Sequence, residues 1–570
     1  MRILLLADTF NSLTQIVYAE LTYRNHELSV ELALSDEIIG EAVELYQPEL
    51  IIAPFLTKII PKRICCDHVC IIIHPGIKGD RGISSLDWAI MTEAKEWGVT
   101  AIQATTEVDA GQIWSSFNFQ MRPDSKSCLY RTEVAQAAIK VILQTIERFE
   151  SGEFVPETLN YSREDVKGCW HPYMKQEVRA IDWTKDTVST IVKKIRSADS
   201  RPGLLDTIDG EQYYLYGAYE EDLLQGTPGQ IIAQRHGAIC RGAVDGAVWI
   251  SHLKKKKPGE SFACLKLPAA IVLGDKLKSI PEAPLPLFLP GNRKTFQEIW
   301  YEEKNQVGYL YFEFYNGAMS IDQCQRLTNA FCYARSRPTK VIVLMGGHDF
   351  WSNGFNLNLV EADDNPSDGS WRHINAINHL VATILTTNTH LTIAAMQGNA
   401  AAGGVMIALA ADYVYARSGI VINPHYQLMG LYGSEYWTYL LPKRVGKKGA
   451  MELTGSCLPV CTQLAQDIGL IDSAFEEHPI SFRLSVVQKA EQIAKCPDYA
   501  EKLALKNQKR LQDEQIKPLE AYVTEELQQI HINLYGAEQL YHTARHQFGY
   551  KISPSQTPLY LAKHRSAYFK

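Results

Sequence analysis

The sequence predicts a multidomain α/β protein. Its 570 residues exceed the roughly 150 of a typical domain, and 46% of them are hydrophobic, as in globular proteins. In both halves, short apolar runs alternate with segments of helix length, which is typical of parallel sheets covered by helices. The formal net charge of -7 argues against nucleic-acid binding, because phosphate recognition usually requires a basic surface.

The first 160 residues show this alternation most clearly. Apolar runs at 3–6, 30–34, 50–53 and 69–73 predict strands that helices connect into parallel βαβ units. Active residues of such sheets collect at the carboxyl ends of the strands, and Asp8, Pro54 and His74 each follow a predicted strand. The N-terminal apolar run is too short for a signal peptide, so we expect a cytoplasmic protein without membrane association.

From about residue 161 the pattern changes. A helix is predicted over 187–198, and short alternating runs at 212–216, 229–233 and 247–250 predict a small β-rich domain. Prolines at 281, 284, 286 and 290 mark a linker, because proline lacks a backbone N–H and restricts the residue before it. The predicted divisions are 1–160, 161–270, a linker over 271–295, and 296–570.

The last region is again α/β. Residues 307–314 and 340–344 are predicted strands, and amphipathic segments over 481–530 predict helices near the C-terminus. The longest apolar stretch, 391–416, contains Gln397 and Asp412, which favours a buried strand, loop and helix over a membrane span. The 12 cysteines form no CxxC pair and no zinc spacing with histidine, so we expect reduced thiols and no metal site.

The first candidate site follows the strand at 69–73. His74 leaves this strand at a Pro-Gly turn and Asp109 lies in another turn, and such a pair can move a proton between an amine and a nucleophile. Either residue alone is more often structural. The surrounding motifs are His74-Pro75-Gly76, Arg81-Gly82, Ser85-Leu86-Asp87-Trp88, Gly98-Val99-Thr100 and Asp109-Ala110-Gly111.

These motifs resemble the 10-formyltetrahydrofolate-dependent formyltransferases, and the resemblance extends through the small β-rich domain. It implies an N-terminal Rossmann-like formyltransferase domain followed by an OB-like domain, with His74 and Asp109 flanking the formyl group. The turns expected to bind the folate contain Pro75, Gly76, Arg81 and Gly82.

One position departs from that family's pattern. An Asn-x-His motif would place asparagine at position 72, where this chain has Ile72. The asparagine donates to the formyl oxygen as it becomes an oxyanion, and losing such a donor costs about 3 kcal/mol of transition-state stabilisation. We therefore expect another donor or a different acceptor chemistry.

The second candidate site combines glycine-containing motifs over 346–357 and 397–406. Small residues let the backbone approach a ligand, and the second motif opens a helix whose first N–H groups lack intrahelical acceptors. In this order and spacing the motifs resemble the crotonase (enoyl-CoA hydratase/isomerase) family. The resemblance implies a ββα spiral domain in which the backbone N–H groups of Phe355 and Gly403 form an oxyanion hole for a CoA thioester. The adjacent turns, expected to bind CoA, contain Gly354 and Gly404.

The carboxylates that hydration requires are predicted to be missing. The resemblance places Met406 at the first hydratase glutamate and His425 or Tyr426 at the second, and a thioether cannot activate water. Glu435 and Tyr426 are the candidates for replacement acid/base or substrate-orienting groups. A tyrosine here can equally be a packing residue, whereas an unpaired buried carboxylate is costly and favours a function for Glu435.

Joined in this order, the two modules resemble the HypX/HoxX hydrogenase maturation proteins over nearly the whole chain. The resemblance implies that 10-formyltetrahydrofolate donates a formyl group to coenzyme A, and that formyl-CoA is then decarbonylated to carbon monoxide, an iron ligand of NiFe-hydrogenase. The expected partners are these small molecules and hydrogenase maturation proteins. Two alternatives stay open: a formyltransferase for another acceptor fused to an acyl-CoA isomerase or hydrolase, and a noncatalytic scaffold that binds CoA.

Overall fold

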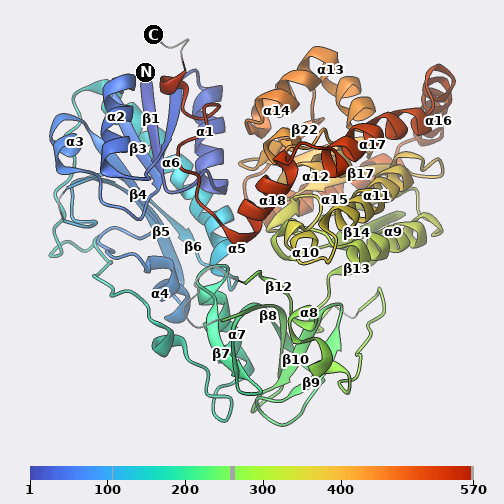
Figure 1. Cartoon of the computed structure of the whole chain (residues 1–570), viewed down its shortest axis with the longest axis horizontal. Coiled ribbons are helices and arrows are strands. Elements are labelled where there is room, and N and C mark those ends of the chain that lie inside the picture. The colour runs from blue at the N-terminus through green and yellow to red at the C-terminus, as the bar shows by residue number, and fades with distance from the viewer. Residues whose placement is uncertain (106, 257–263, 290, 567–570) are drawn as a thin grey trace. The chain divides into compact units, whose positions relative to one another are not determined.

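The computed structural model describes residues 1–105, 107–256, 264–289 and 291–566. Its contacts divide the chain into two units, whose elements are labelled in Figure 1. The first unit holds Met1–Lys257, Pro268–Pro281 and Ser553–Lys570, and the second holds Pro258–Leu267 and Glu282–Ile552. No helix in the described ranges is both long enough and apolar enough to cross a lipid bilayer.

A six-stranded sheet forms the N-terminal part of the first unit, with the order β2-β1-β3-β4-β5-β6. Strands β1 to β4 are parallel and β5 and β6 are antiparallel, so the predicted parallel βαβ units are confirmed for the first four strands. Figure 1 shows α2 and α3 on one side of this sheet and α1 and α6 on the other. The strands are β1 Arg2–Ala7, β2 Glu27–Leu32, β3 Leu50–Phe55, β4 Cys70–His74, β5 Glu96–Gln103 and β6 Ile113–Gln120. The helices are α1 Ser12–Tyr23, α2 Asp36–Tyr46, α3 Lys62–Asp67, α4 Ser85–Met91, α5 Lys126–Leu129 and α6 Ala135–Ser151.

Strand β3 and the residues of β1 after Arg2 are apolar and mostly buried, as expected for parallel strands covered by helices on both faces. On one face, Leu4 of β1 and Ile51 of β3 pack with Ile39 of α2. His74 is the last residue of β4 and therefore lies at the carboxyl edge of the parallel strands. This edge is where the sequence predicted the first site.

A small antiparallel sheet with the order β7-β8-β11-β10-β9 completes the β-rich part of the first unit. Helix α7 packs against it through Ile191 and Ile195, which join a cluster with Leu215 and Ile250. The side chain of Thr187 caps this helix by accepting a hydrogen bond from the Thr190 N–H. The elements are α7 Val188–Ala198, β7 Leu204–Ile208, β8 Glu211–Glu221, β9 Ile231–Arg235, β10 Ala238–Gly242, β11 Ala247–Lys255, β12 Leu267–Pro268 and α8 Ala269–Leu273.

The second unit contains two sheets. The larger has the order β13-β14-β15-β17-β19-β22, and the smaller has the order β16-β18-β20-β21. The strands are β13 Ile299–Lys304, β14 Val307–Phe312, β15 Val341–Leu344, β16 Phe350–Ser352, β17 Leu391–Met396, β18 Asn399–Ala401, β19 Tyr413–Arg417, β20 Val421–Asn423, β21 Val460–Cys461 and β22 Ser473–Phe475. The helices are α9 Ile321–Arg335, α10 Leu357–Glu361, α11 Pro366–Leu385, α12 Gly403–Leu409, α13 Trp437–Ser456, α14 Thr462–Asp467, α15 Pro479–Lys495, α16 Tyr499–Ile516, α17 Leu519–Tyr535 and α18 Leu540–Tyr550.

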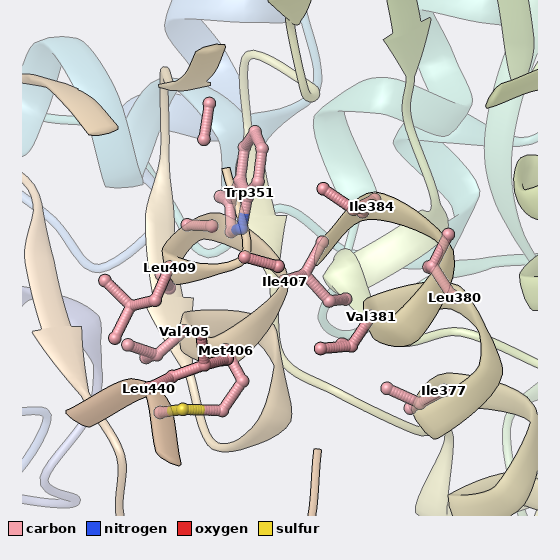
Figure 2. Packing of buried hydrophobic residues seen from close by; sticks show 14 of the residues in the cluster. Trp351, Ile377, Leu380, Val381, Ile384, Val405, Met406, Ile407, Leu409 and Leu440 are labelled. Carbon is pink, nitrogen blue, oxygen red and sulfur yellow. The ribbon is translucent and has the colours of Figure 1, made fainter. Parts of the chain in front are cut away.

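Strand alternation gives the larger sheet two apolar faces. Ile342 and Leu344 of β15 face a cluster that includes side chains of α9, α11 and α12. Val341 and Val343, on the opposite face, pack with Phe482 of α15. Figure 2 shows part of the first cluster, in which apolar residues of α11 and α12 interlock. This core holds α12, the helix that begins at Gly403, in place.

The segment 553–566 packs on β2 of the first unit. Its His564 is fully buried, with Nε2 2.9 Å from Glu31 Oε2 and Nδ1 2.6 Å from Ser29 Oγ. Arg565 Nε donates to the same Glu31 carboxylate at 2.8 Å, and the Leu32 N–H donates to Thr557 Oγ1 at 2.9 Å. The segment therefore supplies partners to buried polar groups of β2.

Candidate active sites

His74 lies between two carboxylates in the first unit. Its Nε2 is 2.8 Å from Asp80 Oδ2, and its Nδ1 is 3.5 Å from Asp109 Oδ2. The structure thus brings together the two residues that the sequence singled out, and it adds Asp80, which the sequence analysis missed. The only signal for Asp80 was a carboxylate in the turn between His74 and Arg81.

The electrostatics of the site favour protonated His74. Burial alone lowers the pKa of His74, but the hydrogen bond with Asp80 and the negative charges of Asp109 and Asp80 raise the pKa above its ordinary value. The other oxygen of Asp80, Oδ1, is 2.9 Å from Nδ1 of His171. Asp80 is therefore held by two histidines, which fixes its orientation toward His74.

The predicted folate-binding turns shape this pair. A Cβ on Gly76 would lie 2.3 Å from Asp80 Oδ2 and 2.5 Å from His74 Nε2, so only glycine fits beside their hydrogen bond. The Gly82 N–H donates to Asp109 Oδ2 at 3.1 Å, and Gly82 has φ +114°. Asp109 also has a positive φ, 51°, which is strained for a residue other than glycine.

Arg81 and Pro75, in the same turns, form hydrogen bonds that fix the backbone around His74 and Asp109. The guanidinium of Arg81 donates to the Val108 carbonyl and pairs with Glu107, next to the Asp109 turn. The Pro75 carbonyl accepts from Ser85 Oγ at 2.7 Å and from Trp97 Nε1 at 2.9 Å. Position 72 contributes only an apolar side chain, because Ile72 packs against the cluster that contains Leu4 and Ile51.

In the second unit, the turn after β16 meets the start of α12. A Cβ on Gly354, which has φ +76°, would lie 3.5 Å from the Gly403 nitrogen. A Cβ on Gly404 would lie 2.1 Å from the Ser352 carbonyl oxygen, so this approach requires glycine. The Gly354 N–H donates to Ser352 Oγ at 3.1 Å. The predicted oxyanion residues, Phe355 and Gly403, are thus on adjoining backbone segments.

The predicted pair Glu435 and Tyr426 is also brought together, next to Gly403. Tyr426 Oη donates to Glu435 Oε2 at 3.0 Å, and the Ser434 N–H donates to the same oxygen at 3.2 Å. Glu435 is 2% exposed and Tyr426 is 5% exposed. A Cβ on Gly403 would lie 2.6 Å from Glu435 Oε1. The carboxylate therefore lies directly against the first residue of α12.

Burial dominates the electrostatics of this pair. It raises the pKa of Glu435 to about 8; the hydrogen bond from Tyr426 opposes this change and the charge of Glu526 adds to it. Burial together with the neighbouring Glu435 also raises the pKa of Tyr426 well above its ordinary value. Glu435 is consequently a carboxyl group that can gain or lose a proton near neutral pH, as an acid/base group must.

Two residues that the sequence analysis missed hold Glu435 in position. Glu435 and Tyr436 both have positive φ, 62° and 61°. Asn378 Oδ1 accepts from the Glu435 N–H at 2.8 Å, and Glu526 Oε2 accepts from the Tyr436 N–H at 2.9 Å. Glu526 is fully buried, and burial raises its pKa to about 7. No motif marked Asn378 or Glu526, because both are remote from Glu435 in sequence.

Met406 and His425, at the positions expected for the hydratase glutamates, offer no carboxylate. Met406 is 0% exposed, and Figure 2 shows it beside Leu440 among apolar side chains. His425 Nδ1 lies 2.8 Å from the Asn423 carbonyl oxygen, and burial lowers the pKa of His425. The thioether of Met406 itself cannot accept a proton from water.

Three regions of the chain match known protein families. The formyl transferase family matches residues 14–146, its C-terminal domain matches 173–265, and the enoyl-CoA hydratase/isomerase family matches 304–534. The methionyl-tRNA formyltransferase of Trichlorobacter lovleyi is 28% identical over 231 residues, which cover 39% of this chain and 71% of that protein.

Two comparisons extend over the whole chain. The hydrogenase maturation factor HoxX of Bradyrhizobium diazoefficiens is 43% identical over 569 residues, which cover 99% of this chain and 97% of that protein. The crystal structure of HypX from Aquifex aeolicus in complex with tetrahydrofolic acid has a TM-score of 0.96 and 43% identity, and the match covers 100% of both chains. These matches confirm the predicted fold class, with a Rossmann-like formyltransferase domain, a small β-rich domain and a crotonase-like domain. The chain belongs to the HypX/HoxX family of hydrogenase maturation factors.

Proposed function

We propose that this protein makes carbon monoxide for hydrogenase maturation in two steps. The first unit transfers a formyl group from 10-formyltetrahydrofolate to coenzyme A, and the second unit decarbonylates formyl-CoA. The observation that carries the proposal is the buried Glu435 carboxyl group beside Gly403, in a unit whose predicted hydratase positions lack carboxylates. The match to a tetrahydrofolate-bound HypX structure supports folate as the carrier.

In the first step, the CoA sulfur attacks the formyl carbon and the carbon–nitrogen bond of the folate breaks. One proton moves from the thiol to the departing nitrogen. His74 is suited to carry it because it bonds Asp80 and faces Asp109, which stabilise its protonated form. In this scheme Asp109 orients His74 and the folate nitrogen, while the absence of a side chain at Gly76 leaves room for the hydrogen bond between His74 and Asp80.

In the second step, the N–H groups of Phe355 and Gly403 bind the thioester oxygen. Ionised Glu435 accepts the formyl proton, and the electron pair of that C–H bond remains on carbon. The C–S bond breaks with its electron pair on sulfur, so CO leaves, and the proton passes from Glu435 to the thiolate. The products are CO and CoA-SH, and no other reactant is consumed.

Excluding water is essential to the second step, because hydrolysis would give formate instead of CO. The apolar surroundings of Met406 and the burial of Glu435 and Tyr426 favour a dry site. Tyr426 then keeps the Glu435 carboxyl oriented through its hydrogen bond.

The test supplies purified protein with 10-formyltetrahydrofolate and CoA, and detects CO by its binding to a haem protein. We expect CO from the unmodified chain and none from His74→Ala, while His74→Ala still releases CO from supplied formyl-CoA. Glu435→Gln should release no CO from either donor, and formyl-CoA should accumulate from 10-formyltetrahydrofolate and CoA. Formate without CO would reject the decarbonylase step, and equal loss of both reactions in His74→Ala would reject the division of labour.

A second candidate, suggested by the likeness to a methionyl-tRNA formyltransferase, is formyl transfer to an amine instead of to coenzyme A. If an amine is the acceptor here, formylated amine should form from 10-formyltetrahydrofolate in the absence of CoA. Ile72 argues against this candidate, because it cannot supply the donor that this class of enzyme places before its histidine.

A further inference from the structure

The side-chain oxygen of Asn378, on α11, is hydrogen-bonded, whereas its side-chain nitrogen has no partner among the described residues. Its Oδ1 accepts hydrogen bonds from the Glu435 N–H at 2.8 Å and from Ser434 Oγ at 3.0 Å. A backbone N–H can only donate, so the oxygen of the amide must face Glu435 and the nitrogen must point the other way. Within the described ranges, no group accepts a hydrogen bond from Asn378 Nδ2.

This free donor is buried. Asn378 is only 5% exposed, and a buried polar atom without a partner is rare in folded proteins. The acceptor role toward Glu435 explains the side-chain oxygen of Asn378. It does not explain why the side chain also carries a buried amide nitrogen. The unused N–H groups therefore point to an acceptor atom that the protein chain does not provide.

A second buried atom on the same helix is in a similar state. His373 Nδ1 is 2.8 Å from the Gly369 carbonyl oxygen, which makes Nδ1 the donor and Nε2 the acceptor. Nε2 has no partner among the described residues, and the His373 ring is 6.0 Å from the ring of Phe355. Helix α11 thus carries two buried polar atoms without a partner among the described residues, one on the ring near Phe355 and one on the amide that bonds Glu435.

We propose that Asn378 Nδ2 donates a hydrogen bond to the carbonyl oxygen of a bound acyl-CoA thioester. Asn378 bonds the backbone of Glu435, and the Glu435 carboxylate lies against Gly403. Gly403 in turn lies next to Gly354, the residue before Phe355. The amide of Asn378 thereby joins the two backbone N–H groups as a side-chain donor of the same site. The inference rests on the proposed thioester-binding role of this unit but not on its decarbonylation chemistry.

Asn378→Asp is the decisive variant, because it keeps an acceptor for the Glu435 N–H and Ser434 Oγ and removes the donor. Calorimetric titration of the full-length protein with acetyl-CoA, which cannot lose CO, measures binding without turnover. We expect Asn378→Asp to weaken acetyl-CoA binding by about tenfold or more and to change the affinity for free CoA by less than about twofold. The matched control is Asn375→Asp on the same helix, whose side chain bonds the Trp371 carbonyl, and it should bind acetyl-CoA normally.

Unchanged acetyl-CoA affinity in Asn378→Asp would overturn the inference. If that variant does not fold, a crystal structure of the unmodified protein with acetyl-CoA decides the matter: the inference requires the thioester oxygen within about 3.2 Å of Asn378 Nδ2, and a longer separation rejects it. If the unmodified protein does not bind acetyl-CoA at all, the proposed function of this unit fails and the inference fails with it. Binding that does not depend on Asn378 rejects the inference alone.

Discussion

Tyr426 Oη lies 3.0 Å from Glu435 Oε2, and both side chains are buried beside the start of α12. The hydroxyl is a donor to the carboxylate and stabilises its charged form, whereas burial stabilises the neutral form. The balance between these two effects sets the pH at which Glu435 can accept a proton.

The pH dependence of CO release from supplied formyl-CoA should report this balance. Burial raises the pKa of Glu435 to about 8, so the ionised base becomes available as the pH rises through that value. We expect the rate to increase from pH 6 to pH 9, and Glu435→Gln to remove this pH dependence and to lower the rate at pH 9 by about 10²–10⁴-fold. A rate that is independent of pH over this range would contradict the assigned role.

Tyr426→Phe should move the same profile to higher pH. The substitution removes a hydrogen bond that favours the carboxylate, and such a bond to a charged group is worth about 1.5–3 kcal/mol, or roughly one to two pKa units. We expect a rate at pH 7.5 at least about tenfold lower that recovers on alkalinisation. Loss at all pH values would instead indicate that the hydroxyl contacts the substrate.

The stability of the fold should also depend on the ionisation of Glu435. Its folded pKa is raised above the ordinary value of 4.5, so its neutral form favours folding and this contribution is lost as pH rises toward 8. The melting temperature of the second unit should therefore fall between about pH 4.5 and pH 8 and level off above it. In Glu435→Gln this part of the decrease should disappear, since glutamine does not titrate.

Gly403→Ala should disable the second step and spare the first. The added Cβ would lie 2.6 Å from Glu435 Oε1, so either the carboxylate or the start of α12 must move. A displacement of about 1 Å can lower a rate about 100-fold, whereas formyl-CoA formation should be unchanged. Gly455→Ala is the control, because nothing lies within 4 Å of the Cβ that it adds. Similar CO rates in both variants would argue against a site at Gly403.

His564→Ala should loosen β2 in the first unit. The change removes the shortest hydrogen bond of Ser29 Oγ and one of the partners of the Glu31 carboxylate, at a cost of about 2 kcal/mol. Hydrogen exchange of the segment Glu27–Leu32 should become faster by roughly one order of magnitude or more. His546→Ala, which breaks a more exposed pair with Glu361, is the control and should leave that segment unchanged.

The sequence predicted those parts of the fold and sites that depend on local patterns. The parallel strands follow from apolar runs, and His74 was identified because it directly follows one of them. Gly354 and Gly403 were identified because close approach of two backbones requires small residues in recognisable motifs. Glu435 and Tyr426 could be named together as candidates because they belong to the same short stretch of chain.

Contacts made across long separations could not be predicted in this way. Asn378 lies 57 residues before Glu435, and Glu526 lies 90 residues after Tyr436. Each is an ordinary helix residue in its own sequence context, and its importance arises only from tertiary packing. The packing of residues 553–566 on β2 bridges the longest separation, and nothing in the sequence pattern of that segment indicates that it pairs with a strand near the N-terminus.

The contact between Glu31 and His564 spans 533 residues. During synthesis on the ribosome, β2 emerges early, but the imidazole and guanidinium that hydrogen-bond its buried carboxylate emerge 533 and 534 residues later. Until that segment is synthesised, the Glu31 carboxylate lacks two of its hydrogen-bond donors, so the N-terminal sheet is completed only after the second unit has emerged.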